Sequence, residues 1–388
     1  MDLSPAAILP ADPEALLFGR VWRPDVSGPS LVRVDGERLT DVTRAFPTAR
    51  DLCEAPDPAA ALRAAEGEDI GPLAAILANT DPAVRDPARP WLLAPVDLQA
   101  VKAAGVTFVT SMLERVIEER ARGNPEAAAG IRAQVRDLVG DDLRALRPGS
   151  AEAETLKQAL IAAGAWSQYL EVGIGPDAEI FTKAQPMASV GAGSEIGVHP
   201  ASTWNNPEPE VVLVIASSGA ILGATLGNDV NLRDVEGRSA LLLGKAKDNN
   251  AAAALGPFVR LFDGGFDLAS VETLSLTLTV TGEDGFDMQG RSEMREISRP
   301  PADLAAQALN VHHRYPDGLA LFLGTLFAPT QDRDEPGRGF THKPGDVVRI
   351  GCAQLGTLVN RVASTSACEP WTFGPGALMR NLARRGLL

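Results

Sequence analysis

Sulfur and imidazole side chains are scarce in this sequence. Its 388 residues include three cysteines and four histidines. The cysteines, Cys53, Cys352 and Cys368, lie far apart and form no Cys-x-x-Cys pair. This spacing argues against a zinc site with cysteine ligands and against a disulfide framework.

Positive charge and long apolar runs are scarce as well. The chain has 36 lysine and arginine residues against 50 aspartate and glutamate residues, a net charge of −14. Nucleic acids and anionic membrane surfaces both select for clustered basic residues, so neither is an expected partner. No apolar run reaches the ~18 residues of a membrane-spanning helix, and residues 1–5 do not resemble the start of a secretory signal. The sequence predicts a soluble, cytoplasmic protein.

A common cofactor fingerprint is missing too. No Gly-x-Gly-x-x-Gly segment opens a helix after a strand, so a dinucleotide-binding fold is not supported. The composition is otherwise ordinary for a globular protein, with 22% charged and 45% hydrophobic residues. A chain of this length predicts two or three structural units with a sizeable buried core.

The first 95 residues predict a small N-terminal α+β domain. Apolar stretches at 15–21 and 31–34 are typical of strands joined by a hairpin, and the Ala/Leu-rich segment 58–77 has helical spacing. The Pro/Asp/Arg-rich segment 81–90 then predicts a linker. We therefore expect residues 1–95 to form one domain and residues 96–388 a second, larger one.

Within the larger domain, a helical segment precedes a β-rich one. Apolar residues recur at steps of three or four across about 112–168, and Gly123-Asn124-Pro125 divides this stretch into separate helices. After residue 170, short β-branched runs alternate with turns, as in the hairpin of 211–216 with 220–226 and the segment 274–280. This order predicts an α+β fold with a mixed or mostly antiparallel sheet rather than repeated βαβ units.

Two glutamates stand at the start of the strongest predicted strand. Side chains two residues apart on a strand point to the same face, so Glu208 and Glu210 are directed the same way. The hairpin brings Asp229 back to the same end of the sheet. Because burying carboxylates together is costly without a cation, the three predict a hard ion, Mg²⁺ before Mn²⁺ or Ca²⁺. For the Glu-Pro-Glu pair alone, an exposed acidic strand end is the alternative.

Five motifs, in order, resemble the signature of the fumarylacetoacetate hydrolase superfamily over roughly residues 100–388. They are Glu179-Ile180-Phe181-Thr182-Lys183, Glu208-Pro209-Glu210-Val211-Val212, Asn228-Asp229-Val230-Asn231-Leu232-Arg233-Asp234, Lys247 with Leu255-Gly256-Pro257, and Lys343-Pro344-Gly345-Asp346-Val347-Val348-Arg349-Ile350. The resemblance implies a catalytic domain with the superfamily's distorted β-roll, into which the helical segment is inserted. It also implies a Mg²⁺ ion held by Glu208, Glu210 and Asp229, with Mn²⁺ as a substitute, and a small-molecule substrate with a 2-oxo-acid head.

One motif departs from the superfamily pattern and narrows the choice among its enzyme branches. Hydrolases and decarboxylases of the superfamily often carry Asn-Tyr-x-x-His-x-x-Glu, whose His/Glu pair orients water. Residues 107–114 here read TFVTSMLE, so Glu114 matches the acid while Ser111 stands where histidine is expected. Serine alone is no useful base at neutral pH, which argues against histidine-driven hydrolysis. The lost histidine, the retained glutamate and Lys247 beyond Asp229 resemble the branch of 2-keto-3-deoxy-D-pentonate (D-xylonate or D-arabinonate) dehydratases.

This branch implies a Mg²⁺-dependent hydro-lyase of oxidative pentose degradation, which converts 2-keto-3-deoxy-D-pentonate into 2-oxoglutarate semialdehyde and water. We expect Lys247 to take the proton from C3 and Glu114 to protonate the leaving C4 hydroxyl, or the reverse. Predicted substrate contacts are Thr330, Ser111, Phe181 and Lys183, the last two with packing behind the site as an alternative. Weaker positional matches, with loop or surface roles as the alternative, are Lys245, Thr325, Ser194, Glu195 and His199.

Two other classes of function stay open at this point. One is a different superfamily reaction on a 2-oxo acid, such as acylpyruvate hydrolysis or oxaloacetate decarboxylation, against which the missing histidine argues. The other is a non-catalytic relative that binds sugar acids, for which three carboxylates and a lysine are not needed. The superfamily also implies assembly as a homodimer or homotetramer.

Overall fold

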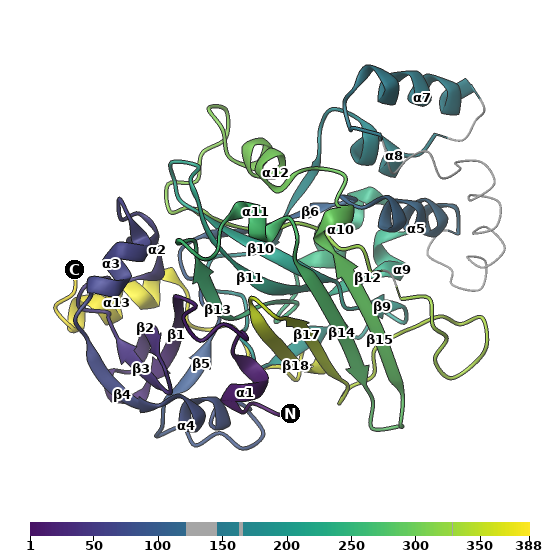
Figure 1. Cartoon of the computed structure of the whole chain (residues 1–388). Helices are drawn as coiled ribbons and strands as arrows, with labels where there is room; N and C mark the ends of the chain where they lie inside the picture. The colour runs from purple at the N-terminus through teal and green to yellow at the C-terminus, as the bar shows by residue number, and fades with distance from the viewer. Residues whose placement is uncertain (122–145, 163–165, 328) are drawn as a thin grey trace.

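The computed structural model describes residues 1–121, 146–162, 166–327 and 329–388. In these ranges two large sheets lie against each other, with helices around them (Figure 1). The larger sheet has the order β4-β3-β2-β1-β13-β11-β10-β16-β6-β7, and β5 also pairs with β1. Its strands are β1 Leu17–Arg23, β2 Gly28–Asp35, β3 Arg38–Asp41, β4 Glu68–Pro72, β5 Trp91–Leu93, β6 Ala100–Gly105, β7 Glu179–Ala184, β10 Pro209–Ile215, β11 Ile221–Asp229, β13 Ala253–Leu261 and β16 Leu319–Phe322.

The smaller sheet has the order β15-β14-β17-β18-β8, and β9 and β12 form a separate short pair. These strands are β8 Glu195–Val198, β9 Asn205–Asn206, β12 Asn231–Leu232, β14 Ser275–Thr281, β15 Asp287–Glu293, β17 Val347–Cys352 and β18 Gly356–Ser364. Within the described residues, the pairs β6–β16 and β8–β18 are parallel and the others are antiparallel. The predicted mixed, mostly antiparallel, β-rich α+β fold is confirmed.

The main core lies between the two sheets, where β10, β11 and β13 contact β14, β17 and β18. Strand β10 is buried along its whole length. Its odd-numbered residues Val211, Leu213 and Ile215 belong to the core shared with the smaller sheet, while Val212 and Val214 pack into a second core on the opposite face. A strand that is buried on both faces explains the unbroken β-branched run in the sequence.

The N-terminal segment extends the larger sheet. The predicted hairpin is formed by β1 and β2, and β1 then pairs antiparallel with β13, Leu17 lying opposite Arg260. The predicted boundary near residue 95 falls between β5 and β6, which both belong to this sheet. The expectation of continuous helical structure over 58–77 is wrong, because β4 adds to β3 between α3 (Pro58–Ala64) and α4 (Leu73–Ala78).

Helices surround the sheets at their edges and ends (Figure 1). Residues 122–145, the middle part of the predicted helical insertion with its break at Gly123-Asn124-Pro125, lie outside the described residues; on either side of them, α5 contacts α8. No described helix has the length and apolar character needed to span a membrane. The remaining helices and 3₁₀ turns are α1 Pro5–Ile8, η1 Pro24–Val26, α2 Ala49–Cys53, α5 Val109–Arg120, α7 Ala151–Ala162, α8 Gln168–Ile174, α9 Arg233–Glu236, η3 Ala240–Leu242, α10 Leu243–Lys247, α11 Leu268–Val271, η4 Met294–Glu296, α12 Pro301–Ala308 and α13 Pro375–Arg384.

Candidate metal centre and active site

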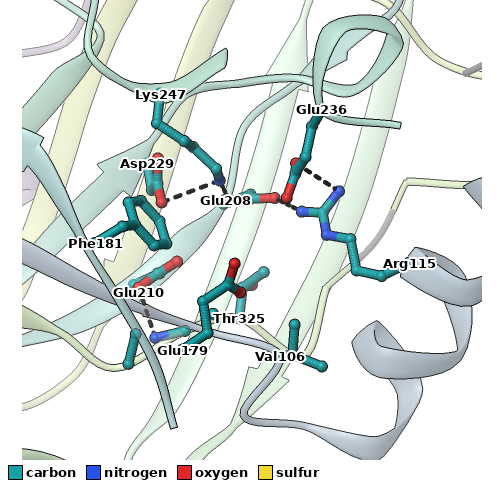
Figure 2. A pocket seen from close by; sticks show the side chains of 13 residues that line it. Val106, Arg115, Glu179, Phe181, Glu208, Glu210, Asp229, Glu236, Lys247 and Thr325 are labelled. Carbon is teal, nitrogen blue, oxygen red and sulfur yellow. Dashed lines mark hydrogen bonds and ion pairs between the residues drawn. The ribbon is translucent and has the colours of Figure 1, made fainter. Parts of the chain in front are cut away.

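Three buried carboxylates meet at one end of the β10–β11 hairpin (Figure 2). Pairing in this hairpin sets Glu210 opposite Gly227, and the backbone N–H of Asp229 donates to the carbonyl of Glu208 at 3.0 Å. One carboxylate oxygen from each of Glu208, Glu210 and Asp229 lies within 4.8 Å of the others. The spacing of two along β10 directs both glutamates to one face, and the return strand adds the aspartate.

Lys247 neutralises part of this negative charge. It is the last residue of α10, and its buried Nζ lies 2.5 Å from Oε2 of Glu208 and 3.1 Å from Oδ2 of Asp229. The ammonium also lies 5.5 Å from the centre of the Phe181 ring. Burial alone lowers the pKa of Lys247, but the charges of Asp229 and Glu208 raise it above the ordinary value.

Lys183, on β7, contacts the cluster through Asp229. Its Nζ is fully buried, donates to the carbonyls of Val230 at 3.0 Å and Lys247 at 2.6 Å, and lies 2.8 Å from Oδ1 of Asp229. An ammonium has three protons to donate, and these are the three acceptors around it. Lys183 therefore ties β7 to Asp229 and to the backbone of Lys247.

The two glutamates of the cluster have pKa values shifted in opposite directions. Burial favours the neutral form of Glu208, but the charges of Lys247 and Arg115 hold its pKa at about 2. Burial and the charges of Asp229 and Glu208 raise the pKa of Glu210 well above its usual range. Glu210 thus lies among like charges that disfavour its ionised form, and a cation held between the three carboxylates would relieve this repulsion.

The three carboxylates and Lys247 line a small hollow, here called the carboxylate hollow. Three further charged residues line it and are missing from the set predicted from sequence. Arg115 on α5 pairs with Glu208, and its Nη1 lies 3.2 Å from Oε2 of Glu236 at the end of α9. Glu179, the first residue of β7, also lines the hollow, and burial followed by the nearby charge of Glu236 raises its pKa to about 7. Glu179 opens a motif noted in the sequence and Arg115 follows Glu114, but neither position alone indicates a side chain directed into the hollow.

The predicted substrate contacts differ in whether their side chains line the hollow. Phe181 lines the hollow, as does the buried Thr325. Thr330 is exposed and is not among the lining residues. Ser111 belongs to α5, but its side chain lies outside the described residues. The assignments of Thr330, Ser111, Phe181 and Lys183 as substrate contacts stay predictions.

Glu114 is buried on α5 and lies close to the guanidinium of Arg233. Its Oε2 is 3.9 Å from Nη2 of Arg233, whose guanidinium stacks 4.3 Å from the centre of the Trp204 ring. Arg115, rather than Glu114, is among the residues that line the hollow. The assigned proton donor therefore pairs with Arg233, and its neighbour in the helix, Arg115, reaches the cluster.

The weaker positional matches lie around the margin of this region. Nζ of the exposed Lys245 is 3.0 Å from Nε2 of His199, and neither residue lines the hollow. Glu195 begins β8, and Ser194 lines a different cavity. These positions fit the alternative loop or surface roles given for the four residues.

A glycine is required where the chain passes Glu210. The backbone N–H of Gly324 donates to Oε2 of Glu210 at 2.7 Å. Gly324 has φ +88°, and a Cβ atom there would lie 2.0 Å from Oγ1 of Thr107. A side chain at this position would strain the backbone and displace the loop that donates to the glutamate.

A protein-family model matches just over half of the chain. Residues 165–363, which include the three carboxylates and both lysines, match the fumarylacetoacetate hydrolase C-terminal family. The chain belongs to this family.

Two curated relatives of this family member are named dehydratases. The 2-dehydro-3-deoxy-D-arabinonate dehydratase of Saccharolobus solfataricus is 33% identical over 184 residues, 47% of this chain and 58% of the relative. A probable 2-keto-3-deoxyxylonate dehydratase of Haloferax volcanii is 32% identical over 196 residues, 50% of this chain and 64% of the relative. The matched segments thus span less than two thirds of either relative.

Solved structures share the fold over most of the chain. A 2-keto-3-deoxy-D-arabinonate dehydratase in its apo form superposes with a TM-score of 0.60 at 20% identity, covering 90% of this chain and 99% of that one. The structure of that enzyme complexed with magnesium and 2,5-dioxopentanoate gives a TM-score of 0.59 at the same identity and coverage. At this identity the likeness establishes the fold.

The side chains of this family member fit a divalent cation. Glu208, Glu210 and Asp229 offer only oxygen ligands, which suit Mg²⁺. All three are buried, and a cation between them would favour the ionised form of Glu210, whose pKa burial and the neighbouring carboxylates raise. Among the described residues, these three form a group that can hold the ion.

Proposed function

We propose that this protein is a Mg²⁺-dependent dehydratase that converts 2-keto-3-deoxy-D-pentonate into 2-oxoglutarate semialdehyde (2,5-dioxopentanoate) and water. The observation that supports this most is the buried cluster of Glu208, Glu210 and Asp229 with the ammonium of Lys247 against two of its members. The dehydratase names of the two curated relatives support the substrate class. A divalent cation held by these oxygen ligands, together with the ammonium of Lys247, would suit a 2-oxo acid, whose carboxylate and keto oxygens are electron-rich.

The proposed reaction needs one proton acceptor and one proton donor. C3 loses a proton and the C4 hydroxyl leaves as water after accepting a proton, which gives the 3,4-unsaturated 2-oxo acid. A proton then moves from C5 to C3, and the resulting C4–C5 enol tautomerises to the C5 aldehyde of the product. When bound, Mg²⁺ supplies a Lewis acid for the negative charge that develops at the 2-keto oxygen. Each positioned proton-transfer group typically contributes about 10²–10⁴-fold to the rate.

The sequence predicts Lys247 at C3 and Glu114 at the C4 hydroxyl, or the reverse. The raised pKa of Lys247 supports the reverse, because an ammonium can donate a proton but cannot accept one. The geometry adds Glu179 as a third candidate, because its carboxyl lines the hollow from β7 while Lys247 reaches it from α10 (Figure 2). A pKa of about 7 suits a group that exchanges protons near neutrality. Glu114→Gln and Glu179→Gln distinguish the two candidates. Replacing the residue that transfers the proton should lower kcat by about 10²-fold or more, while the variant still binds Mg²⁺.

The hollow among the lining side chains holds about 20 Å³, enough for one ion or water rather than a five-carbon acid. Binding the proposed substrate therefore requires lining side chains to move. Arg115, which bridges Glu208 and Glu236 from α5, is placed to do so. Its movement would leave a guanidinium free to meet the substrate carboxylate.

A turnover assay tests the proposal directly. 2-Keto-3-deoxy-D-pentonate is incubated with the protein with and without Mg²⁺, and the semialdehyde is measured with an added aldehyde dehydrogenase. Product that requires Mg²⁺ and disappears on chelation is the expected result. Bound Mg²⁺ without product contradicts the proposal, and acylpyruvates and oxaloacetate are then the substrates to assay. Use of Mn²⁺, cytoplasmic location and assembly as a homodimer or homotetramer stay predictions.

A further inference from the structure

Arg115 contacts two carboxylates that differ in their surroundings. Its Nη2 pairs with Oε1 of Glu208, one of the three candidate metal ligands, and its Nη1 lies 3.2 Å from Oε2 of Glu236. Glu236 lines the carboxylate hollow but lies outside the group of three described carboxylates that can hold a metal ion. Arg115, on α5, therefore joins a candidate metal ligand to a carboxylate of α9 that is not one (Figure 2).

Both carboxylate oxygens of Glu208 contact a protein cation. Arg115 pairs with Oε1, and Nζ of Lys247 lies 2.5 Å from Oε2. A divalent cation that Glu208 helps to hold binds one of these two oxygens. The protein cation at that oxygen then meets a like charge at close range, and in a buried site this repulsion is strong enough to favour its withdrawal. Arg115 and Lys247 are the two candidates for this movement.

The other contacts of the two cations decide between them. Lys247 also lies 3.1 Å from Oδ2 of Asp229, so the two described carboxylates that it contacts are both candidate metal ligands. Arg115 keeps the carboxylate of Glu236 at Nη1 when Nη2 leaves Glu208. A guanidinium carries its donors in a fixed fork, so one arm can be released while the other stays paired. Withdrawal from the cluster therefore disrupts fewer charge contacts for Arg115 than for Lys247.

We propose that Arg115 competes with the divalent cation for Oε1 of Glu208, and that Glu236 is a positioning residue that holds the guanidinium of Arg115 when it withdraws. The movement makes and breaks no covalent bond, because Nη2 leaves Glu208 while Nη1 stays on Glu236. This role rests on the proposed function, since it requires the cation site of the dehydratase. Arg115 and Glu236, neither of them a candidate metal ligand, then change the affinity for Mg²⁺ in opposite directions.

Isothermal titration calorimetry of the full chain with Mg²⁺, without substrate, measures this affinity. Arg115→Gln removes the competing charge and should lower the Kd for Mg²⁺ by about tenfold or more, since a charge within ~4–6 Å shifts an ionic equilibrium by about 1–3 pK units. Glu236→Gln should raise the Kd by about tenfold, because Arg115 loses the carboxylate that draws it off the cluster. Glu119→Gln is the matched control. This carboxylate lies one turn along α5 from Arg115 and accepts a hydrogen bond from Gln168 on α8, so its loss should change the Kd by about twofold or less.

The double variant Arg115→Gln/Glu236→Gln separates two explanations for the effect of Glu236. If Glu236 acts only as a negative charge near the bound ion, Glu236→Gln raises the Kd by the same factor with or without Arg115. If it acts through Arg115, the two changes are not additive, and Glu236→Gln should change the Kd of the Arg115→Gln protein by about twofold or less. Arg115→Lys is a second background, which also serves if Arg115→Gln does not fold. Lysine keeps the charge but not the fork that contacts both carboxylates, so Glu236→Gln should again change the Kd by about twofold or less.

Three results overturn the proposal. The first is a Kd that Arg115→Gln raises or leaves unchanged, which would show that Arg115 does not compete for Glu208. The second is an equal factor for Glu236→Gln with and without Arg115, and the third is a wild-type protein that binds no Mg²⁺. Far-UV circular dichroism of each variant confirms that it is folded.

The turnover assay separates this proposal from the proposed function. The expected Mg²⁺ affinities without turnover of 2-keto-3-deoxy-D-pentonate would contradict the dehydratase reaction and leave the roles of Arg115 and Glu236 standing. Mg²⁺-dependent turnover with an equal factor for Glu236→Gln in both backgrounds would contradict the role of Glu236 and leave the dehydratase reaction standing.

Discussion

Replacing Lys183 with methionine removes an ammonium group that three buried acceptors surround. The two side chains have similar length, so the change deletes the charge and the donors with little loss of volume. The carbonyls of Val230 and Lys247 then lose a donor, and Oδ1 of Asp229 loses a cation 2.8 Å away. Because these acceptors are buried, water cannot take the place of the ammonium.

The expected loss of stability is large. A buried acceptor left without a partner costs about 1–3 kcal/mol, and removing one member of a buried ion pair costs about 3–5 kcal/mol. The two values describe overlapping contacts, so they do not add. We expect Lys183→Met to lower the free energy of unfolding by about 3–5 kcal/mol, a substantial share of the about 5–15 kcal/mol typical of folded proteins.

Urea unfolding followed by far-UV circular dichroism measures this loss. Lys102→Met is the matched control, because Lys102 lies on the neighbouring strand β6 but is only partly buried and donates to Oγ1 of Thr182 at 2.9 Å. The control should change the free energy of unfolding by less than about 0.5 kcal/mol. Equal unfolding midpoints for the two variants would refute the reasoning and show that the contacts of Lys183 contribute no more than a surface hydrogen bond.

Three further predictions concern the metal, the backbone and pH. Mg²⁺ at about a hundredfold excess over its Kd should raise the free energy of unfolding by about 2.7 kcal/mol, and Glu210→Gln should remove most of this gain; equal gains in thermal melts would contradict the ligand assignment. Gly324→Ala should lower the free energy of unfolding by about 1–3 kcal/mol. Gly337→Ala should lower it less, because Gly337 has φ +82° but no atom lies within 4 Å of the Cβ that the change adds. Similar melting temperatures for the two variants would show that the loop of Gly324 relaxes. Burial raises the pKa of Asp346, but hydrogen bonds from Arg333 and His342 outweigh it and lower the pKa from 3.8 to about 2. The contribution of Asp346 to stability is therefore present above pH 3.8 and is lost as pH falls toward 2. Asp346→Asn should flatten that part of the stability profile, and an unchanged acid transition would show that Asp346 does not cause it.

The sequence by itself determines the strands and the carboxylates that they carry. The β-branched run of β10, the turn at Ser217-Ser218-Gly219 and the return strand β11 are local signals, and a two-residue period fixes which side chains share a face. Glu208, Glu210 and Asp229 follow from these rules alone. The family resemblance added Lys247, whose Nζ lies against two of the carboxylates.

Only the tertiary structure decides which other charged groups surround them. Arg115, Glu179 and Glu236 come from α5, β7 and α9, whose packing against one another depends on contacts between distant parts of the chain. The role of Lys183 changes for the same reason: its charge is evident in the sequence, but its three acceptors come from two other segments. The joining of β1 to β13, more than 200 residues apart, likewise follows from neither strand's own pattern. Periodicity is a property of one segment, whereas the partners of a buried charge are set by how all the segments pack.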